Sequence, residues 1–236
     1  MRKHLKGYTA PKSWSFQRKK VRFITRPRPG PHKLMESVTL NFILIRILNL
    51  AKTRKEVKKI LNQKKVLIDN IPRTDENFPV GLMDTISIPD ANLHFRVIYS
   101  KSGKFKLIPI KKEETEIKPK KIINKTVLKK NKLQINLYDG TNILSDKKDY
   151  KVGDTLVFQK NKIKTHIPLK EGTTIYLTAG KHLGHTGKLQ KIIKLKGLSK
   201  DKVILTIGKD KVETLKDYAF AIDEALIKWI QWNKSK

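Results

Sequence analysis

Hydrophobic positions after residue 37 predict a first helix. Four apolar residues stand at i, i+4, i+7 and i+8, the spacing of the buried stripe on an amphipathic helix. These residues are Leu40, Leu44, Ile47 and Leu48. Ser37 comes just before the stripe and can act as its N-cap. We expect the helix to run from there to about Ala51.

A capping box predicts a second helix over about residues 54–62. The Thr53 hydroxyl can accept from the amide three residues on, and the Glu56 side chain can reach back to the amide of the cap. Val57, Ile60 and Leu61 form its apolar stripe. Four basic residues fall outside that stripe: Arg54, Lys55, Lys58 and Lys59. A helix that buries one side and presents four cations on another suits contact with a polyanion.

Short strands follow the two helices. Val66 to Asp69 reads as a strand, Asp69-Asn70 as a turn, and Gly81 to Ile88 as a further turn and strand. Two helices packed on a small sheet predict a compact α/β unit over residues 38–92.

From Leu93 onward the hydrophobic period changes to two. Leu93 to Tyr99 and Phe105 to Ile110 read as a hairpin, and later strands recur at near-regular spacing. We therefore expect a small all-β domain over residues 93–170. A run of acids and lysines between its strands is expected to be a surface connector. That run contains Glu113, Glu114, Glu116, Lys118, Lys120 and Lys121.

A glycine-rich loop distinguishes the unit expected over residues 171–214. The loop, Ala179 to Lys188, connects two predicted strands and holds three glycines, which permit positive φ and a close approach of the backbone to a partner. It places donors and charge together on Lys181, His182, His185 and Lys188. The two histidines lie in a loop with no cysteine or carboxylate nearby, so contact with RNA or a structural role is favoured over metal binding.

Residues 215–236 allow two interpretations. Ile222, Leu226, Trp229 and Ile230 fall at helical spacing, which predicts a C-terminal helix docked on the unit of residues 171–214 or on a protein neighbour. The alternative is an apolar tail held in a crevice of an assembly.

Residues 1–37 do not read as a folded domain. Cations are spread along the segment, with Tyr8, Trp14, Phe16 and Phe23 between them. Its apolar groups are too few to offset the ordering entropy of an isolated chain. We expect a basic N-terminal extension that becomes ordered when threaded into RNA, with cations on phosphates and aromatic rings on bases. A merely solvated tail is the alternative.

Charge and composition narrow the function. The 236 residues include 53 Lys and Arg against 21 Asp and Glu, for a formal net charge of +32. Such self-repulsion destabilises a free compact protein, whereas phosphate neutralises it. A Lys-rich proteome is the alternative origin of the excess. The chain lacks cysteine, an apolar signal core and a membrane-length apolar run, so we expect an intracellular protein without disulfides or membrane contact.

Four stretches carry resemblances, three of them to one family and the fourth to a motif. The run TRKEVKKILNQKKVLIDNIPRTDENFPVGLMDTISI, residues 53–88, is similar to the S-four RNA-binding domain, in the version found in the archaeal and eukaryotic small-subunit ribosomal S-four-e family. The openings KHLKGYTAPKSW and RPRPGPHKLMES resemble that family's N-terminal extension, and AGKHLGHTGKLQKI resembles the KOW motif of a small, bent β-barrel. The family ends differently, with a strand near 218–222 and a short basic tail.

The resemblance implies an α+β, multidomain fold: a basic extended N-terminal tail, a small α/β S-four-like domain, a central small β domain and a KOW-containing small β-barrel. It implies a non-catalytic constituent of the small ribosomal subunit, cytoplasmic within the ribosome. Expected partners are ribosomal RNA and neighbouring small-subunit proteins, with no cofactor, metal, membrane or small-molecule substrate. RNA contacts are expected at Arg2, Lys3, Lys6, Lys12, Trp14, Arg18, Lys19, Lys20, Arg22, Arg26, Arg28, Arg54, Lys55, Lys58, Lys59, Lys64, Lys65, Lys181, His182, His185 and Lys188.

Two other functions remain to be weighed against this one. A KOW-containing transcription or translation factor would bind transiently, and the long N-terminal extension argues against it. An S-four-domain RNA-modifying enzyme would need a larger catalytic domain and a cofactor fingerprint, and no Gly-rich loop opens a helix after a strand here.

Overall fold

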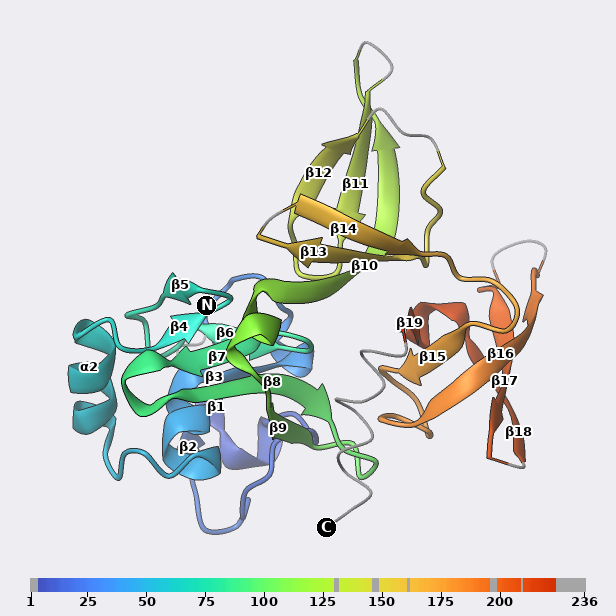
Figure 1. The fold of residues 1–236 in the computed structure, drawn as a ribbon. Coiled ribbons are helices and arrows are strands. Elements are labelled where there is room, and N and C mark those ends of the chain that lie inside the picture. Colours follow the sequence, from blue (N-terminus) through green and yellow to red (C-terminus); the bar gives the residue numbers. More distant parts are fainter. Residues whose placement is uncertain are drawn as a thin grey trace. The chain divides into compact units, whose positions relative to one another are not determined.

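The computed structural model describes residues 4–129, 132–145, 149–160, 162–195, 199–208 and 210–223. The described part is mostly β with few helices (Figure 1). It divides into two compact units, the first comprising residues 1–99 and 103–118 and the second residues 100–102 and 119–236. None of the helices in these ranges has the length and apolar character needed to cross a membrane.

The first predicted helix is shorter than expected and begins later. It consists of α1 (Leu40–Phe42) and a π-helical turn, η3 (Ile43–Ile47), in which the Leu48 amide donates to the Ile43 carbonyl five residues back. Thr39 is its cap, accepting a hydrogen bond from the Phe42 amide. The expected cap, Ser37, lies instead in β3 (Ser37–Thr39), which pairs with β6 (Pro79–Gly81). Strand pairing therefore places Ser37 in the sheet, although the local capping signal had placed it at the start of the helix.

The second helix is confirmed as α2 (Arg54–Asn62). The Glu56 amide donates to the Thr53 hydroxyl at 3.3 Å, as the capping box requires. The carboxylate reaches one residue further than expected, accepting from the Lys52 amide at 2.9 Å. Val57 and Leu61 are fully buried, which fixes the apolar side of the helix.

One antiparallel sheet holds the first unit together, in the order β5-β4-β7-β8-β9. Its strands are β4 (Leu67–Ile68), β5 (Ile71–Pro72), β7 (Thr85–Ile88), β8 (Leu93–Tyr99) and β9 (Phe105–Pro109). The β8–β9 hairpin was expected in the next domain, but β8 pairs with β7, for instance Phe95 with Ile86. The division between the compact units thus comes after Lys118, later than the boundary placed at residue 93. Period-two patterning identifies strands without identifying their partners.

The N-terminal segment is folded into the first unit, which corrects the expectation of an unstructured extension. Strand β1 (Leu5–Lys6) pairs with β2 (Phe23–Ile24), and short 3-10 turns follow at η1 (Gly7–Thr9) and η2 (Leu34–Glu36). Trp14 is 2% exposed, and its Nε1 donates to the Ser37 carbonyl at 2.8 Å. The segment has too few apolar groups to fold alone, but it buries them against residues further along the chain.

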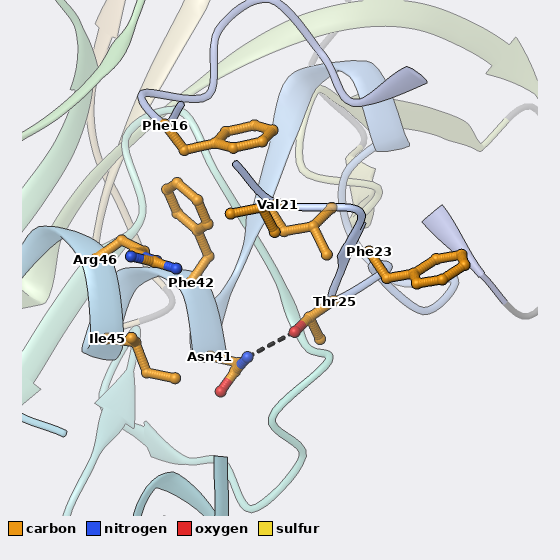
Figure 2. Close-up of a pocket in the computed structure, with 9 residues that line it drawn as sticks. Phe16, Val21, Phe23, Thr25, Asn41, Phe42, Ile45 and Arg46 are labelled. Carbon is orange, nitrogen blue, oxygen red and sulfur yellow. Dashed lines mark hydrogen bonds between the residues drawn. The ribbon is translucent and has the colours of Figure 1, made fainter. Parts of the chain in front are cut away.

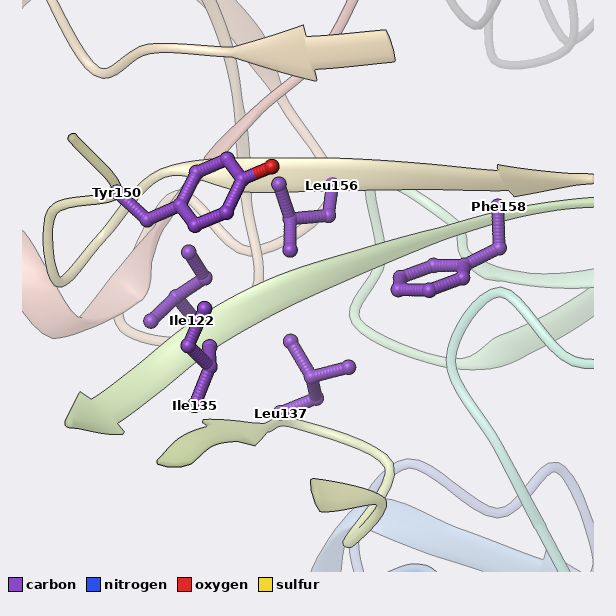
Figure 3. Close-up of a cluster of buried hydrophobic side chains, with 6 residues drawn as sticks. All are labelled: Ile122, Ile135, Leu137, Tyr150, Leu156 and Phe158. Carbon is purple, nitrogen blue, oxygen red and sulfur yellow. The ribbon is translucent and has the colours of Figure 1, made fainter. Parts of the chain in front are cut away.

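The second unit begins with a five-stranded sheet ordered β12-β11-β10-β13-β14. Its strands are β10 (Ile117–Val127), β11 (Leu133–Leu137), β12 (Asn142–Ser145), β13 (Thr155–Gln159) and β14 (Lys162–Ile167). Figure 3 shows its core, in which Leu156 and Phe158 lie opposite Ile135 and Leu137. This buried cluster forms where alternating apolar residues of the paired strands meet.

The charged run before this sheet is not a surface connector. Its acids lie in the 3-10 helix η5 (Lys112–Glu116), and Lys118, Lys120 and Lys121 are already in strand β10. Carboxylates or carbonyls accept from each lysine: the Lys120 Nζ lies 2.7 Å from Asp139, and the Lys121 Nζ donates to the Asp217 carbonyl at 2.7 Å. These partners allow the lysines to occupy a half-buried strand.

A second sheet in this unit has the order β18-β17-β16-β15-β19. Its strands are β15 (Thr174–Leu177), β16 (Thr186–Ile193), β17 (Lys202–Ile207), β18 (Asp210–Leu215) and β19 (Ala219–Ala221). The short 3-10 turn η7 (Lys216–Tyr218) comes directly before β19. In the first unit, the similar turn η4 (Pro89–Ala91) lies between β7 and β8. Strand β16 starts at Thr186, so the last three residues of the predicted glycine-rich loop are already extended.

After the 3-10 turn η7, the C-terminal segment is extended through β19 and Ile222, where a helical stripe was expected to begin. Ile222 directly follows β19, is buried, and donates its amide to the Thr174 carbonyl at 2.9 Å. Pairing of β19 with β15 therefore removes Ile222 from the expected helical stripe. Its other members, Leu226, Trp229 and Ile230, lie outside the described residues.

Candidate nucleic-acid interface

Helix α2 presents its four predicted cations on the surface. Arg54, Lys55, Lys58 and Lys59 are all exposed, on the sides away from the buried Val57. They differ in their partners, because two of them approach a buried carboxylate and two do not. Lys55 and Lys59 have no ion pair among the described residues, so they remain available to a polyanion.

Glu76 explains the difference between the two pairs. Its carboxylate is buried and accepts from Arg54 Nε at 2.8 Å and from Arg54 Nη2 at 2.6 Å. Lys58 Nζ lies 3.6 Å from the same group. Burial alone would raise the pKa of Glu76, but the hydrogen bonds and charge of Arg54 and the charge of Lys58 outweigh it and lower that pKa. Arg54 thus has a structural task, which its position outside the apolar stripe did not reveal.

Replacing Arg54 with glutamine should destabilise the first unit by about 1–3 kcal/mol at pH 7, because a buried carboxylate loses its main hydrogen-bond donor. The depressed pKa of Glu76 contributes stability above its unfolded pKa of about 4.3, and this contribution disappears as pH falls. The difference between wild type and Arg54→Gln should therefore shrink below about pH 4. Urea unfolding at several pH values measures it. Lys55→Gln is the control, and an equal loss in both variants would contradict the assignment.

The two lysines after α2, Lys64 and Lys65, also differ in whether they form an ion pair within the described part of the chain. Lys64 is exposed and adopts φ 56°, in the left-handed region that ends the helix. Lys65 Nζ lies 3.0 Å from an Asp90 carboxylate oxygen, an exposed ion pair that phosphate can displace at little cost. Both remain reachable from outside.

Cations of the N-terminal segment fall into exposed and engaged groups. Exposed ones are Lys6, Lys12, Lys19, Lys20, Arg22 and Arg28. Arg28 pairs with Asp75 at 3.1 Å. The Arg18 guanidinium donates at 2.7 Å to the carbonyls of Ala10 and Pro11, so it holds the segment's own turns. Arg26 is half-buried, and Arg2 and Lys3 lie outside the described residues.

Trp14 is not available to stack on a base, contrary to expectation. Its indole is buried against the Phe42 ring, with centroids 5.0 Å apart, so its role is in packing. Among the other aromatic residues of the segment, Tyr8 is 72% exposed and Phe23 is 51% exposed. Tyr8 and Phe23 therefore stay candidates for base stacking, because composition does not identify which ring faces outward.

The glycine-rich loop of the second unit brings only part of its predicted set together. The His182 and His185 rings stand edge to face with centroids 6.0 Å apart, and both are half-buried. Lys181 and Lys188 are exposed. Of these four, Lys188 lines an open groove of about 620 Å³, together with Thr174, Thr186, Gly187 and Thr206 among others. At Gly187 a Cβ would lie 2.6 Å from the Thr206 carbonyl oxygen, so glycine is required there.

A buried charge cluster escaped the sequence analysis. Lys118 Nζ lies 2.6 Å from both Asp69 and Asp84, and His32 Nε2 lies 2.9 Å from Asp84. Burial alone would raise the pKa of Asp84, but Lys118 and His32 hold it well below its usual range. Burial and the neighbouring Asp84 charge raise the pKa of Asp69. This cluster joins the N-terminal segment, the sheet and the start of β10.

Three family models match the chain. The model described as "Ribosomal family S4e" matches residues 91–165, the "RS4NT (NUC023) domain" residues 1–35, and the "S4 domain" residues 40–86. The last of these covers both helices, strands β4 to β6 and the first two residues of β7, and so includes the cationic face of α2.

Curated proteins and solved structures resemble the chain over most of its length. The small ribosomal subunit protein eS4 of Methanocaldococcus jannaschii is 41% identical, covering 96% of this chain and 97% of that protein. The protein of the same name from Methanosphaera stadtmanae is 39% identical, covering 94% and 93%. The crystal structure of the 30S ribosomal protein S4e from Thermoplasma acidophilum is similar with a TM-score of 0.70 and 31% identity, covering 81% of this chain and 97% of that one.

Proposed function

This chain belongs to ribosomal family S4e, and on that premise we propose that it is a structural constituent of the small ribosomal subunit that binds ribosomal RNA. Its contribution to translation is non-catalytic. The observation that carries this function is identity of 41% over nearly the whole length to a small-subunit protein. The exposed cations of α2 and of the N-terminal segment supply the chemistry that such a role needs.

Binding works mainly through phosphate contact and shape. Each exposed lysine or arginine beside a phosphate releases counterions, which supplies affinity without reading sequence. Lys55, Lys59 and Lys64 form one rigid cationic surface at α2. Lys6, Lys12, Lys19 and Lys20 add exposed cations on the folded N-terminal segment, and Lys181 and Lys188 add two more in the second unit.

The proposal also assigns a role to each domain of the chain. Residues 38–92 act as the S4 (S-four) RNA-binding module, and the segment before them packs into the same compact unit. The sheet formed by β15 to β19 is a small KOW-type β-barrel, supported by its glycine-rich loop and its five antiparallel strands. Neighbouring small-subunit proteins are further partners, and the protein works in the cytoplasm as part of the ribosome. The relatives give no support to a transient factor or an RNA-modifying enzyme.

Replacing Lys55 and Lys59 together with glutamine should weaken binding to small-subunit ribosomal RNA and leave the first unit folded. Both lysines are exposed and have no ion pair among the described residues, so their loss costs phosphate contacts alone. The slope of log affinity against log salt should fall by about one for each lysine. Filter binding or fluorescence titration at several salt concentrations measures both quantities.

The matched control removes the same charge from strand β14. Lys162→Gln with Lys164→Gln changes two exposed lysines and lowers the net charge equally. If the two double variants bind alike at every salt concentration, the α2 surface is not the contact.

A further inference from the structure

A small cavity lies within the first unit, between the N-terminal segment and the helix that starts at Leu40 (Figure 2). Its volume is about 130 Å³. It is lined by Phe16, Val21, Phe23, Ile24, Thr25, Asn41, Phe42, Ile45 and Arg46. The family function described above, a set of phosphate contacts, makes no use of it.

Aromatic rings line the cavity. Phe16 and Phe42 meet edge to face with centroids 6.0 Å apart and an interplanar angle of 76°. Phe23 is half exposed, although a side chain of its size is usually buried when it serves packing alone. A flat aromatic ligand would therefore find ring surfaces both inside the cavity and beside it.

Asn41 gives the cavity a polar group with incomplete hydrogen bonding. Its Nδ2 donates to Thr25 Oγ1 at 2.6 Å, while its buried Oδ1 has no hydrogen-bond partner among the described residues. Buried polar atoms without partners are rare, and each calls for a physical explanation. Rotation about the soft χ2 torsion turns this oxygen toward a donor that enters the cavity, and it exchanges the hydrogen bond from Nδ2 to Thr25 for the new one. In Figure 2 the Oδ1 branch points away from Thr25.

Cations surround the cavity without filling it. Arg46 is exposed and lines it, and Arg22, also exposed, has its guanidinium carbon 5.4 Å from the centroid of the Phe23 ring. Lys19 and Lys20 are exposed on the same segment. The surroundings thus suit a ligand that is an aromatic ring carried on an anionic backbone.

We propose that this cavity binds one unpaired pyrimidine base of RNA. An apolar cavity of about 150 Å³ holds a benzene ring, so one of this size suits a single six-membered ring, and it is below the ~300–1,000 Å³ typical of larger ligands. The base stacks on the phenylalanine rings, and its N–H group donates to Asn41 Oδ1. Arg46 and Arg22 contact the flanking phosphates. The proposal rests on the RNA-binding function above and adds a base-specific contact to it.

The test compares full-length variants on two single-stranded RNAs, ten uridines and ten adenosines. Phe23→Ala removes a half-exposed ring. Asn41→Leu with Thr25→Val replaces both hydrogen-bonding partners by apolar groups of similar shape, a change that stability tolerates well. Tyr8→Ala is the matched control, since Tyr8 is an exposed aromatic residue of the same segment that does not line the cavity.

Both cavity variants should lose about five-fold or more in affinity for the uridine strand, the effect of one lost base–aromatic stack. In both cavity variants, affinity for the adenosine strand should change less than affinity for the uridine strand. Photocrosslinking with 4-thiouridine in the uridine strand should label peptides from residues 16–25 or 41–46 of the wild-type protein. Thermal unfolding of each variant verifies that the first unit remains folded.

Equal losses on both RNAs, or cavity variants that behave like Tyr8→Ala, would overturn the proposal while leaving the general RNA-binding function in place. The same holds for crosslinks confined to other peptides, or for variants that impair only association with another small-subunit protein. Wild-type protein that binds neither RNA nor small-subunit ribosomal RNA would overturn the base pocket together with the proposed function.

Discussion

Replacing Trp14 with alanine should destabilise the first unit by about 3–5 kcal/mol, the usual cost of deleting a buried large aromatic side chain. The indole is 2% exposed, packs on Phe42, and donates its N–H to the Ser37 carbonyl at 2.8 Å. The substitution removes apolar contacts, leaves a cavity and deprives a buried carbonyl of its donor. Because a small unit has a total stability of only about 5–15 kcal/mol, the effect should be large.

Urea unfolding followed by far-UV circular dichroism measures this change. Tyr8→Ala provides the matched control, because Tyr8 is an exposed aromatic residue six positions earlier and should cost less than about 0.5 kcal/mol. Deleting residues 1–37 should likewise abolish the cooperative unfolding of residues 38–118. If Trp14→Ala matches the control, or if the truncated protein retains its transition, the segment is an appendage and not part of this core.

Replacing Lys118 with methionine should destabilise the same unit by about 3–5 kcal/mol at pH 7, because the buried carboxylate of Asp84 and the half-buried carboxylate of Asp69 lose the ammonium group between them. Lys118 Nζ lies 2.6 Å from both Asp69 and Asp84, and its side chain is 12% exposed. Asp84 keeps His32 at 2.9 Å and the Gly81 amide at 2.8 Å, but Asp69 keeps only weaker hydrogen bonds from Thr85. The like charges then repel, and His32 at Asp84 and the charge of the buried Arg96 guanidinium offset that repulsion only in part.

The pH dependence distinguishes this mechanism from lost packing. Without Lys118 the folded-state pKa values of the carboxylates rise above their unfolded values near 3.9, so the folded variant binds protons first as pH falls. The loss of unfolding free energy in Lys118→Met, relative to wild type, should therefore become smaller toward acid pH. A loss caused by poorer packing would stay the same at every pH. Adding Asp69→Asn should recover part of the loss. Lys112→Met, at an exposed position, is the control, and a deficit independent of pH would contradict the charge explanation.

Local sequence signals predicted the local structure well. The capping box between Thr53 and Glu56 and the stripe through Val57 and Leu61 define α2 within the chain itself, because a helix makes its contacts within four residues. The same reasoning identified the strands β8, β9, β11 and β13 from their period of two. Where a neighbouring strand competed for the same residues, as at Ser37, the local signal failed.

The cationic candidates were identified by sequence only as residue types. Lys55 and Arg54 look equivalent in the helix, yet Arg54 binds Glu76, which lies 22 positions later. Trp14 and Phe23 look equivalent in a basic segment, yet one is buried and the other half exposed. Burial and ion pairing depend on partners that are distant in the sequence, and no periodicity specifies them.

What the sequence determined by itself is therefore the charge of the protein, the existence of α2 and most strands, and membership in an RNA-binding family through its motifs. Tertiary structure alone decided that residues 4–37 belong to the first core, that β8 pairs with β7, and that Lys118 lies between Asp69 and Asp84. It also formed the cavity beside Asn41 from two separate segments. The reason is physical: helix and turn geometry depend on neighbours within a few residues, whereas burial free energy depends on whichever surfaces the folded chain brings together.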